Sequence, residues 1–270
     1  MNAEPGIPPL LRTAGISDEA PALLDPRHLA ENRICGFGQM SEQLYPFFMI
    51  RSTLLAHVEA TGHRTFAITS IEAGNGKTHV ATNLAAVLSR VRPTILVELD
   101  LRRPTLGARL GLTGAGPGID DYLAGEAAWS DTATRIDGVD LAVHRVRRAH
   151  PSAEQLLASP RLAHALRHIA AEAEEAICII DTPPALIGDD LVHIARNIDG
   201  VLLVAQEGRS RKSGVREVTG ALGGTPIIGS ILNMSLSQPA RRNEYGYPAG
   251  RGPDREMPGR TAPATGRKRT

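Results

Sequence analysis

A glycine-rich turn joins a short apolar strand to an apolar helix in the first third of the chain. The strand TFAIT (65–69) leads into the segment IEAGNGKT (71–78), and a helix rich in Ala, Leu and Val is expected over 78–90. Such a turn points several backbone N–H groups at one spot, and the helix dipole adds a field that favours an anion there. A strand before the loop and a helix after it are the context that this kind of loop requires. The segment therefore predicts an anion site within an α/β fold.

The rest of the chain repeats the alternation of strand and helix. Fully apolar strands separated by helices of ten or more residues indicate βαβ units and a parallel sheet that is buried on both faces. We therefore predict the α/β class: a doubly wound, mostly parallel sheet with helices on both faces, in a single domain with a disordered tail. The expected strands are 94–99, 139–143, 177–180, 201–205 and 227–232, and the expected helices are 41–60, 119–124, 153–175 with a break near Pro160, 189–197 and 212–222.

Two segments outside this pattern set the expected domain limits. Residues 1–40 contain five prolines and no sustained periodicity, so a loosely ordered leader with a short helix near 26–32 is expected. The last 33 residues hold ten Pro or Gly, eight Arg or Lys and three acids, and they carry a net charge of +5. We expect residues 41–236 to form the folded α/β domain and residues 237–270 to form a disordered, basic tail rich in Pro, Gly and Arg.

Charge and cysteine usage exclude several classes of protein. The whole chain has a net charge of +1, which argues against a surface that coats nucleic acid, so no nucleic-acid partner is expected. Two cysteines are too few for a disulfide framework, and no apolar run approaches the ~20 residues that a membrane-spanning helix needs. The N-terminus lacks the charge pattern and the long apolar stretch of a secretory signal. We expect a cytoplasmic protein whose contact with a membrane is indirect, through a partner or the basic tail.

Lys77 and Thr78 occupy the loop positions at which side chains contact a nucleotide. A lysine there reaches the β- and γ-phosphates, and the hydroxyl that follows it binds Mg²⁺. Only three of the 30 basic residues are lysines, so abundance alone does not explain a lysine at this place. Ile71 departs from the general pattern, which has glycine at the first position, and an ordinary glycine turn is the alternative interpretation.

Two apolar strands end in acidic residues, which supply the carboxylates that a Mg·ATP site needs. The run ILVELDLRRP (95–104) contains Glu98 and Asp100, and AICIIDTPP (176–184) contains Asp181. In parallel α/β sheets the carboxyl ends of the strands line the ligand site. We predict Asp181 as a Mg²⁺ ligand through water, and Asp100 and Glu98 as candidates for metal binding and for accepting a hydroxyl proton. Each acid alone is also typical of a turn, and the combination with the loop favours the site.

Together these motifs resemble those of a known family. AGNGKT, ILVELDLRRP and CIIDTPP are similar to the Walker A, A′ and B motifs of the bacterial tyrosine kinases (BY-kinases, CpsD/CapB-like), which are cytoplasmic P-loop ATPases of the ParA/MinD-like class. The resemblance continues in PSAEQLLAS (151–159), DGVLLVAQEGRSRKSGV (199–215) and PIIGSILN (226–233), and it covers about residues 41–236. The leader helix and the Tyr-Gly-Tyr tail look most like the subgroup associated with exosortase-linked exopolysaccharide clusters. The implied fold is that of a P-loop NTPase.

The motifs and the resemblance give four groups of candidate site residues. The catalytic candidates are Lys77, Glu98, Asp100 and Asp181, and the Mg²⁺ ligands are Thr78, Asp100 and Asp181. The cofactor-binding candidates are Gly74, Asn75, Gly76, Lys77, Thr78, His79, Arg102 and, toward the adenine, Asn233. In the family the residues at Arg102 and Arg103 steady phosphate or a neighbouring subunit, and for His79 packing on the helix after the loop is the alternative. The phosphoacceptors are Tyr245 and Tyr247, in the basic tail.

The resemblance implies a function as well as a site. It implies an ATP-dependent, non-specific protein-tyrosine kinase that phosphorylates its own tail, with ATP and Mg²⁺ as cofactors, and that regulates polymerisation and export of capsule or exopolysaccharide. The implied partners are a membrane chain-length determinant or polysaccharide co-polymerase protein and other copies of the chain. We therefore expect a cytoplasmic protein that a partner recruits to the inner face of the cell membrane.

Four departures from the family pattern keep two alternatives open. Glu98 stands in place of the usual Asp, and Ala73 in place of the usual Pro. The ring-forming E-x-x-R-x-x-R motif keeps only its last position, Arg51, and the tyrosine cluster is reduced to two residues. These features motivate a catalytically weak ATP-binding regulatory subunit as one alternative. A ParA/MinD-like ATPase is the other, and Glu72 argues against it because those proteins carry a signature lysine at that position.

Overall fold

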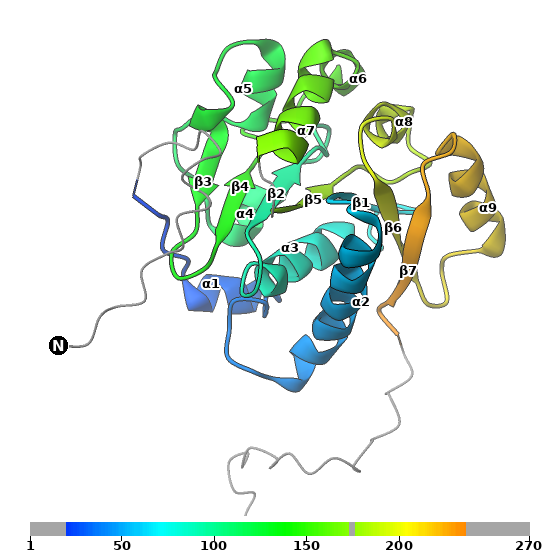
Figure 1. Ribbon diagram of the computed structural model, residues 1–270, viewed down its shortest axis with the longest axis horizontal. Helices are drawn as coiled ribbons and strands as arrows, with labels where there is room; N and C mark the ends of the chain where they lie inside the picture. Colours follow the sequence, from blue (N-terminus) through cyan, green and yellow to red (C-terminus); the bar gives the residue numbers. More distant parts are fainter. Residues whose placement is uncertain (1–19, 173–175, 236–270) are drawn as a thin grey trace, which may run out of the picture. The chain divides into compact units, whose positions relative to one another are not determined.

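A seven-stranded sheet forms the centre of the molecule (Figure 1). The computed structural model describes residues 20–172 and 176–235. The strands are β1 (Thr65–Ser70), β2 (Thr94–Glu98), β3 (Ala133–Arg135), β4 (Leu141–His144), β5 (Ile177–Asp181), β6 (Gly200–Gln206) and β7 (Ile227–Asn233). Their order is β3-β4-β2-β5-β1-β6-β7, and all neighbours are parallel except β3 and β4, which are antiparallel. The predicted α/β class with a mostly parallel sheet is confirmed.

Helices cover both faces of this sheet, as predicted. They are α1 (Pro26–Glu31), α2 (Tyr45–Thr61), α3 (Lys77–Leu88), α4 (Leu106–Leu110), α5 (Ile119–Ala124), α6 (Ala153–Leu157), α7 (Pro160–Glu172), α8 (Asp190–Ala195) and α9 (Lys212–Ala221), with 3₁₀ turns η2 (Glu42–Leu44) and η3 (Ser130–Thr132). α2 packs on α3, and α3 contacts the central strands β1, β2 and β5. No helix within the described ranges is both long and apolar enough to cross a membrane.

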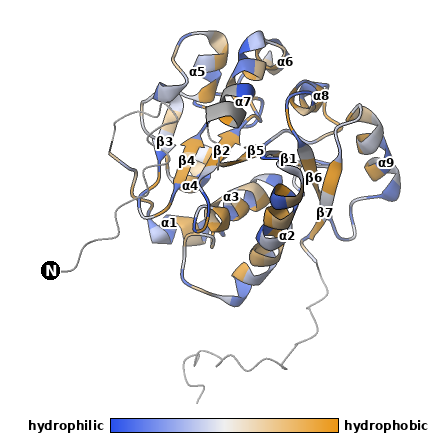
Figure 2. Ribbon diagram, viewed as in Figure 1, coloured by the Kyte–Doolittle hydropathy of each residue, from blue (hydrophilic) through white to orange (hydrophobic). Residues whose placement is uncertain are grey.

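Alternate residues of each strand point to opposite faces, and this divides the core. Phe66 and Ile68 of β1 pack with α2 and α3, whereas Ala67 between them packs with α8 and α9. Ile95 and Val97 of β2 pack with α5, α6 and α7. Figure 2 shows the apolar residues concentrated on the strands and on α3. Because the sheet is buried on both faces, a functional site has to form from the strand ends and the loops that follow them.

Residues 20–40 of the expected leader belong to the folded domain. The predicted short helix is present as α1, and the segment after it is fastened to α3 by Asn83. The Asn83 Oδ1 atom accepts hydrogen bonds from the backbone N–H groups of Cys35 and Gly36, both at 2.8 Å. The sequence predicts a loosely ordered leader, whereas these residues are ordered. Their partner, Asn83, lies 47 to 48 residues further along the chain, so the contact leaves no periodic pattern in the leader sequence. Residues 1–19 lie outside the described ranges.

We expect Gly36→Ala to destabilise the fold and to release this part of the leader. A Cβ atom at residue 36 would lie 2.5 Å from the Ala86 Cβ and 2.9 Å from the Asn83 backbone oxygen, so the segment would have to move away from α3. Overpacking of this kind costs about 1–3 kcal/mol of unfolding free energy. Urea unfolding and limited proteolysis of the leader would measure both effects. Gly220→Ala is the control, because a Cβ at that helical position meets nothing within 4 Å; equal stability of wild type and Gly36→Ala would contradict this account of the packing.

Candidate active site

The glycine-rich loop connects the end of β1 to the start of α3, as the sequence predicts. Gly74 and Gly76 have φ angles of 88° and 91°, in the left-handed region that side chains with a Cβ rarely adopt. A Cβ at Gly76 would also collide with the side-chain amide of Asn233. Both glycines are therefore required by the backbone of the loop.

Ile71 does not disturb this loop, although the general motif has glycine there. Its side chain is buried and packs in the core with residues of α8 and α9. The close neighbour is Gly214 of α9, where an added Cβ would lie only 2.6 Å from the Ile71 Cγ2. Ile71 thus anchors the loop to α9, and the absence of a side chain at Gly214 makes room for it.

Lys77 lies between two carboxylates at the carboxyl ends of the strands. Its Nζ is 2.7 Å from Asp100 Oδ2 and 3.7 Å from Asp181 Oδ1, and it donates a hydrogen bond to Thr78 Oγ1 at 3.3 Å. The register explains this meeting, because β2 and β5 are neighbours and Asp181 pairs with the last residue of β2. The structure therefore brings together four of the predicted residues: Lys77, Thr78, Asp100 and Asp181.

Burial and charge act against each other within this cluster. Burial lowers the pKa of Lys77, but the carboxylates of Asp181 and Asp100 outweigh it, so that the pKa of Lys77 is raised and the ammonium form is held. Burial raises the pKa of Asp181, and the charge of Lys77 opposes that effect. Both Asp181 oxygens are buried and have no hydrogen-bond partner of normal geometry among the described residues. A buried carboxylate without such partners is free to accept a cation or a water bound to one.

This donor set fits Mg²⁺. Magnesium is bound in nucleotide sites through one or two carboxylates together with phosphate oxygens and water, rather than by a protein cage. Thr78 and Asp181 offer a hydroxyl and a carboxylate whose oxygens have no hydrogen bond of normal geometry among the described residues. Within the described ranges no group of three or more His, Cys, Asp or Glu residues could hold a metal alone. The candidate ligands are thus of the kind that shares a metal with bound phosphates.

Glu98 is held by structural hydrogen bonds, and this geometry does not support its predicted catalytic role. It is fully buried, and its Oε1 accepts hydrogen bonds from the N–H groups of Thr105 at 2.6 Å and Leu106 at 2.7 Å, while Oε2 accepts one from Val146 at 3.0 Å. Both oxygens are therefore occupied by backbone donors. Glu98 connects the start of α4 to the segment after β4, and we assign it no part in metal binding or proton transfer.

Glu98 should make the stability of the fold depend on pH. Burial raises its pKa from 4.5 to about 7, against the lowering effect of the backbone donors. The folded chain then binds more protons than the unfolded chain between these two values, so the unfolding free energy falls as the pH rises from about 4.5 to about 7. The upper bound is about 3 kcal/mol. Urea unfolding across this range should show a steeper fall for wild type than for Glu98→Gln, which does not titrate; parallel curves would contradict the assignment.

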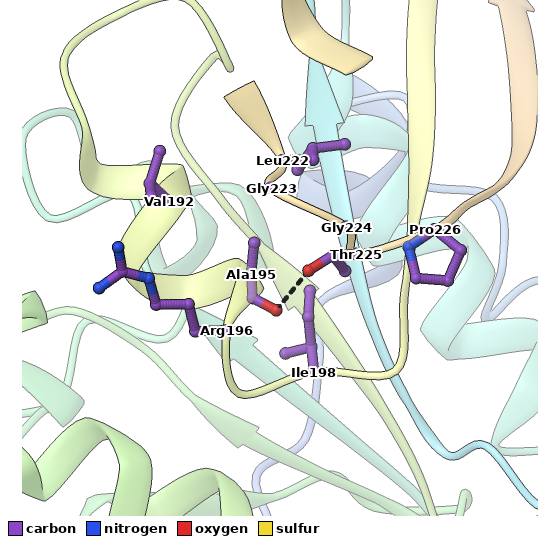
Figure 3. A pocket seen from close by; sticks show the side chains of 9 residues that line it. All are labelled: Val192, Ala195, Arg196, Ile198, Leu222, Gly223, Gly224, Thr225 and Pro226. Atoms are coloured by element: carbon purple, nitrogen blue, oxygen red, sulfur yellow. Dashed lines mark hydrogen bonds between the residues drawn. The ribbon is translucent and has the colours of Figure 1, made fainter. Parts of the chain in front are cut away.

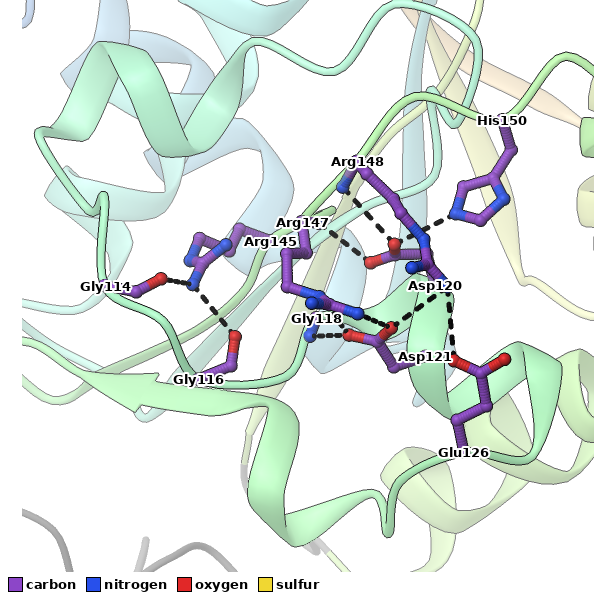
Figure 4. A network of polar contacts seen from close by, with 10 residues as sticks. All are labelled: Gly114, Gly116, Gly118, Asp120, Asp121, Glu126, Arg145, Arg147, Arg148 and His150. Carbon is purple, nitrogen blue, oxygen red and sulfur yellow. Dashed lines mark hydrogen bonds and ion pairs between the residues drawn. The ribbon is translucent and has the colours of Figure 1, made fainter.

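A network of ion pairs holds the segment that meets Glu98 (Figure 4). Arg147 donates to Asp121 of α5 from Nε at 2.7 Å, and its backbone N–H donates to Asp120 at 2.8 Å. His150 lies 2.9 Å from the same Asp120 carboxylate, and Arg148 reaches Glu126 at 3.2 Å. The network thereby fixes residues 145–150 on α5, with the Val146 N–H aimed at Glu98.

Arg102 and Arg103 lie close to the site, and the side chain of Arg102 is not directed into it. Arg102 binds both oxygens of Asp190, at 2.7 and 3.0 Å, and one oxygen of Glu154, at 2.8 Å. It therefore connects the loop after β2 to α6 and α8, and the predicted contact of its side chain with a nucleotide has no support in this geometry. Arg103 is exposed, and its backbone N–H donates to Asp100 Oδ1 at 3.1 Å. The Arg103 backbone thus orients the carboxylate that pairs with Lys77.

Two of the cofactor-binding candidates, Asn75 and Asn233, form hydrogen bonds that stabilise the glycine-rich loop. Asn75 Oδ1 accepts from the Glu72 N–H at 2.9 Å, and its Nδ2 donates to Gln206 at 3.3 Å. Asn233, at the end of β7, donates to the Asn75 carbonyl at 2.8 Å. These bonds tie β6 and β7 to the phosphate loop. Contact of Asn233 with an adenine stays a prediction.

His79 packs on α3 as the alternative interpretation has it. Its ring stands edge-on to Phe47 of α2 with centroids 5.7 Å apart, and burial lowers its pKa. Its Nδ1 is 3.2 Å from the Asn83 side-chain nitrogen. The ring therefore belongs to the contact between α2 and α3, and no geometry directs it at the loop's anion site.

A hollow elsewhere in the fold does not belong to this site (Figure 3). It has a volume of about 560 Å³ and is lined by residues that precede β6 and β7, among them Ile198 and Pro226. Thr225, which also lines it, donates a hydrogen bond to the Ala195 carbonyl at 2.8 Å. It lies at the amino ends of these strands, whereas Lys77 and its carboxylates lie at the carboxyl ends.

Comparison with known proteins decides the family. No protein-family model matches the chain. The tyrosine-protein kinase CpsD of Streptococcus agalactiae is 29% identical over 190 residues, which are 68% of this chain and 81% of that protein. The crystal structure of the VpsO kinase domain is 30% identical with a TM-score of 0.64, covering 77% of this chain and 95% of that one. The chain belongs to the bacterial tyrosine kinase family. MinD from Pyrococcus horikoshii, complexed with Mg-ADP, shares the fold at 24% identity, with a TM-score of 0.54 over 63% of this chain and 69% of that one.

The ring-forming motif of the family is expected on α2, where only its last arginine, Arg51, is present. This arginine makes contacts within the chain. Arg51 of α2 donates to the Val87 carbonyl of α3 at 3.2 Å, and its guanidinium lies 4.7 Å from the ring centroid of Phe48. The side chain is thereby committed to the contact between α2 and α3. Two further family features, the expected acceptors Tyr245 and Tyr247, lie outside the described residues.

Proposed function

We propose that the chain is an ATP-dependent protein-tyrosine kinase that phosphorylates tyrosines in its own tail. The observation that carries this proposal is the position of Lys77, whose ammonium lies 2.7 Å from Asp100 and 3.7 Å from Asp181 at the end of a glycine-rich loop. A cation, two carboxylates and a row of backbone N–H groups are the parts that phosphoryl transfer uses. Membership of the bacterial tyrosine kinase family and the name of the similar CpsD support tyrosine as the acceptor.

The residues of the cluster account for the proposed reaction. The tyrosine oxygen bonds to the γ-phosphorus of ATP, the bond from that phosphorus to the bridging oxygen breaks, and ADP leaves. The hydroxyl proton passes to a carboxylate, and Asp100 is our candidate because its carboxylate lies beside Lys77 at the end of the glycine-rich loop. Lys77 stabilises the charge that builds up on the transferring group. Thr78 and Asp181 would hold Mg²⁺, which when bound neutralises phosphate charge.

Labelling with γ-labelled ATP tests the acceptors. We expect label on the wild-type chain, incubated with Mg²⁺ and the cytoplasmic segment of its membrane partner, and a loss of most of it in Tyr245→Phe/Tyr247→Phe. Tyr122→Phe is the matched control, because Tyr122 is buried against Arg161 and Trp129 in the domain. Label that persists in the double variant would show that the tail is not the acceptor. No label on the wild-type chain would overturn the kinase assignment.

The proposed setting is the assembly of capsule or exopolysaccharide. The support is the similarity to capsule-type kinases such as CpsD. We propose a cytoplasmic protein, active with a membrane chain-length determinant or co-polymerase that recruits it to the inner membrane face, and able to form homo-oligomers. Placement in the exosortase-linked subgroup rests on the leader helix, which is present as α1, and on the Tyr-Gly-Tyr motif of the tail.

A catalytically weak, ATP-binding regulatory subunit is the second candidate. The engagement of Glu98 by three backbone donors favours it, because one of the two A′ acids is thereby withdrawn from chemistry. Normal ATP affinity without transfer of label would select this candidate. A ParA/MinD-type mechanism has less support, since Glu72 stands at the signature position and its carboxylate accepts a hydrogen bond from Ser210 at 2.9 Å.

A further inference from the structure

The loop after β6 lies directly against the phosphate loop. Three hydrogen bonds fix its geometry: Asn75 donates to the Gln206 side chain at 3.3 Å, Ser210 donates to Glu72 at 2.9 Å, and the Gln206 N–H donates to Ser210 at 3.0 Å. The turn of this loop is made by Gly208, whose φ angle is 73°. The two loops therefore form one unit, and the residues between Gln206 and Ser210 are held over the phosphate loop.

Arg209 occupies the position in this unit that is nearest to Gly74. Apart from the neighbours of Gly74 in the chain, the atom closest to an ideal Cβ at Gly74 is Arg209 Nη1, at 3.4 Å. Both residues are exposed, so the guanidinium lies on the open side of the loop and not in the core. Within residues 20–172 and 176–235, no carboxylate forms an ion pair with it. The Arg209 guanidinium therefore adds a positive charge on the exposed side of the phosphate loop, next to the backbone N–H groups of that loop.

We propose that Arg209 is a positioning residue that binds the phosphates of the nucleotide from the open side of the glycine-rich loop. Lys77 supplies the cation on the inner side, where it is shared with Asp100 and Asp181. Arg209 supplies a second cation on the outer side, where no carboxylate of the described residues forms an ion pair with it, and its planar guanidinium can donate two parallel hydrogen bonds to phosphate oxygens. The inference deepens the proposed function and rests on it, because the ligand is the ATP of the same site.

Nucleotide affinities distinguish this role from a structural one. We expect Arg209→Ala to raise the Kd of Mg·ATP by about tenfold, to raise the Kd of Mg·ADP less, and to leave the affinity for adenosine unchanged. Isothermal titration calorimetry on the full chain measures all three. Arg209→Lys keeps the charge without the fork and should fall between wild type and Arg209→Ala. Arg211→Ala is the matched control, because Arg211 is also an exposed arginine and follows Ser210 directly in the chain. Its substitution should leave the Kd of Mg·ATP unchanged.

Each outcome separates the two proposals. Equal ATP affinity of wild type and Arg209→Ala would overturn the role of Arg209 and leave the proposed function standing. An equal loss for ATP, ADP and adenosine would also overturn it, because that pattern means a disturbed loop and no phosphate contact. A loss of affinity that is large for ATP, smaller for ADP and absent for adenosine would support the role of Arg209. If the wild-type chain then transferred no phosphoryl group, the proposed kinase function would be overturned. A wild-type chain that binds no ATP would overturn both.

Discussion

Lys77→Met should strongly reduce phosphoryl transfer and weaken the fold at the same time. The transferring phosphoryl group loses its inner cation, and removal of one stabilising group of this kind lowers kcat by about 10²–10³-fold. The carboxylates of Asp100 and Asp181 also lose the charge that pairs with them, although their side chains are only 6% and 0% exposed. Breaking a buried pair from one side costs about 3 kcal/mol or more. Label transfer from ATP and urea unfolding without Mg²⁺ measure the two effects.

Lys212→Met is the matched control for this substitution. Lys212 is also the first residue of a helix, α9, but it is exposed and no carboxylate of the described residues pairs with it. We expect transfer and stability to stay at wild-type levels. If Lys77→Met kept transfer within tenfold of wild type, Lys77 would not be the cation of a phosphoryl-transfer centre.

Glu98→Ala should destabilise the chain by about 3 kcal/mol, because three backbone N–H groups lose a charged acceptor in the core. Glu98→Asp should recover only part of this, since a side chain shorter by one methylene does not span the gap between Leu106 and Val146. Both values come from denaturant unfolding near pH 7.5. Transfer of label per folded molecule should stay within a few fold of wild type under stabilising conditions.

The control for Glu98 is an exposed carboxylate that forms an ion pair. Glu154 is 54% exposed and pairs with Arg102, so Glu154→Ala should change the unfolding free energy by less than about 1 kcal/mol. A Glu98→Gln variant that folds as stably as wild type but transfers no label would reverse the assignment. In that case Glu98 would be the proton acceptor that the sequence suggested.

The centre of the fold was accessible from sequence because its signals are local. Apolar runs marked β1, β2, β5, β6 and β7, and the structure places each within one or two residues of its expected limits. β3 has only three residues and pairs antiparallel with β4, so it carries no periodicity of its own. α4, with five residues after the A′ motif, is equally short. Such elements are defined by their neighbours and not by their own sequence.

The site residues also fall into two groups, those that local sequence signals identify and those whose position depends on distant partners. Lys77, Asp100 and Asp181 were accessible because the carboxyl ends of adjacent parallel strands meet at one edge of the sheet. The direction of a side chain at the end of a strand or in the loop after it depends on partners far along the chain. Glu98 turns toward Val146, 48 residues away, and Arg102 toward Asp190, 88 residues away. Motif position alone predicts these two residues in the site and does not contain that information.

Tryptic mass spectrometry of the chain expressed with and without Lys77→Met tests the central claim most directly, that the Lys77 cluster transfers phosphate from ATP to tyrosine. The peptides that contain Tyr245 and Tyr247 should carry phosphate in the wild-type protein and none in the Lys77→Met protein. Both forms should be compared at equal amounts of folded protein, since the variant is expected to be less stable. Tail phosphotyrosine that is equally abundant in both forms, or absent from both when the membrane partner is co-expressed, would contradict the claim.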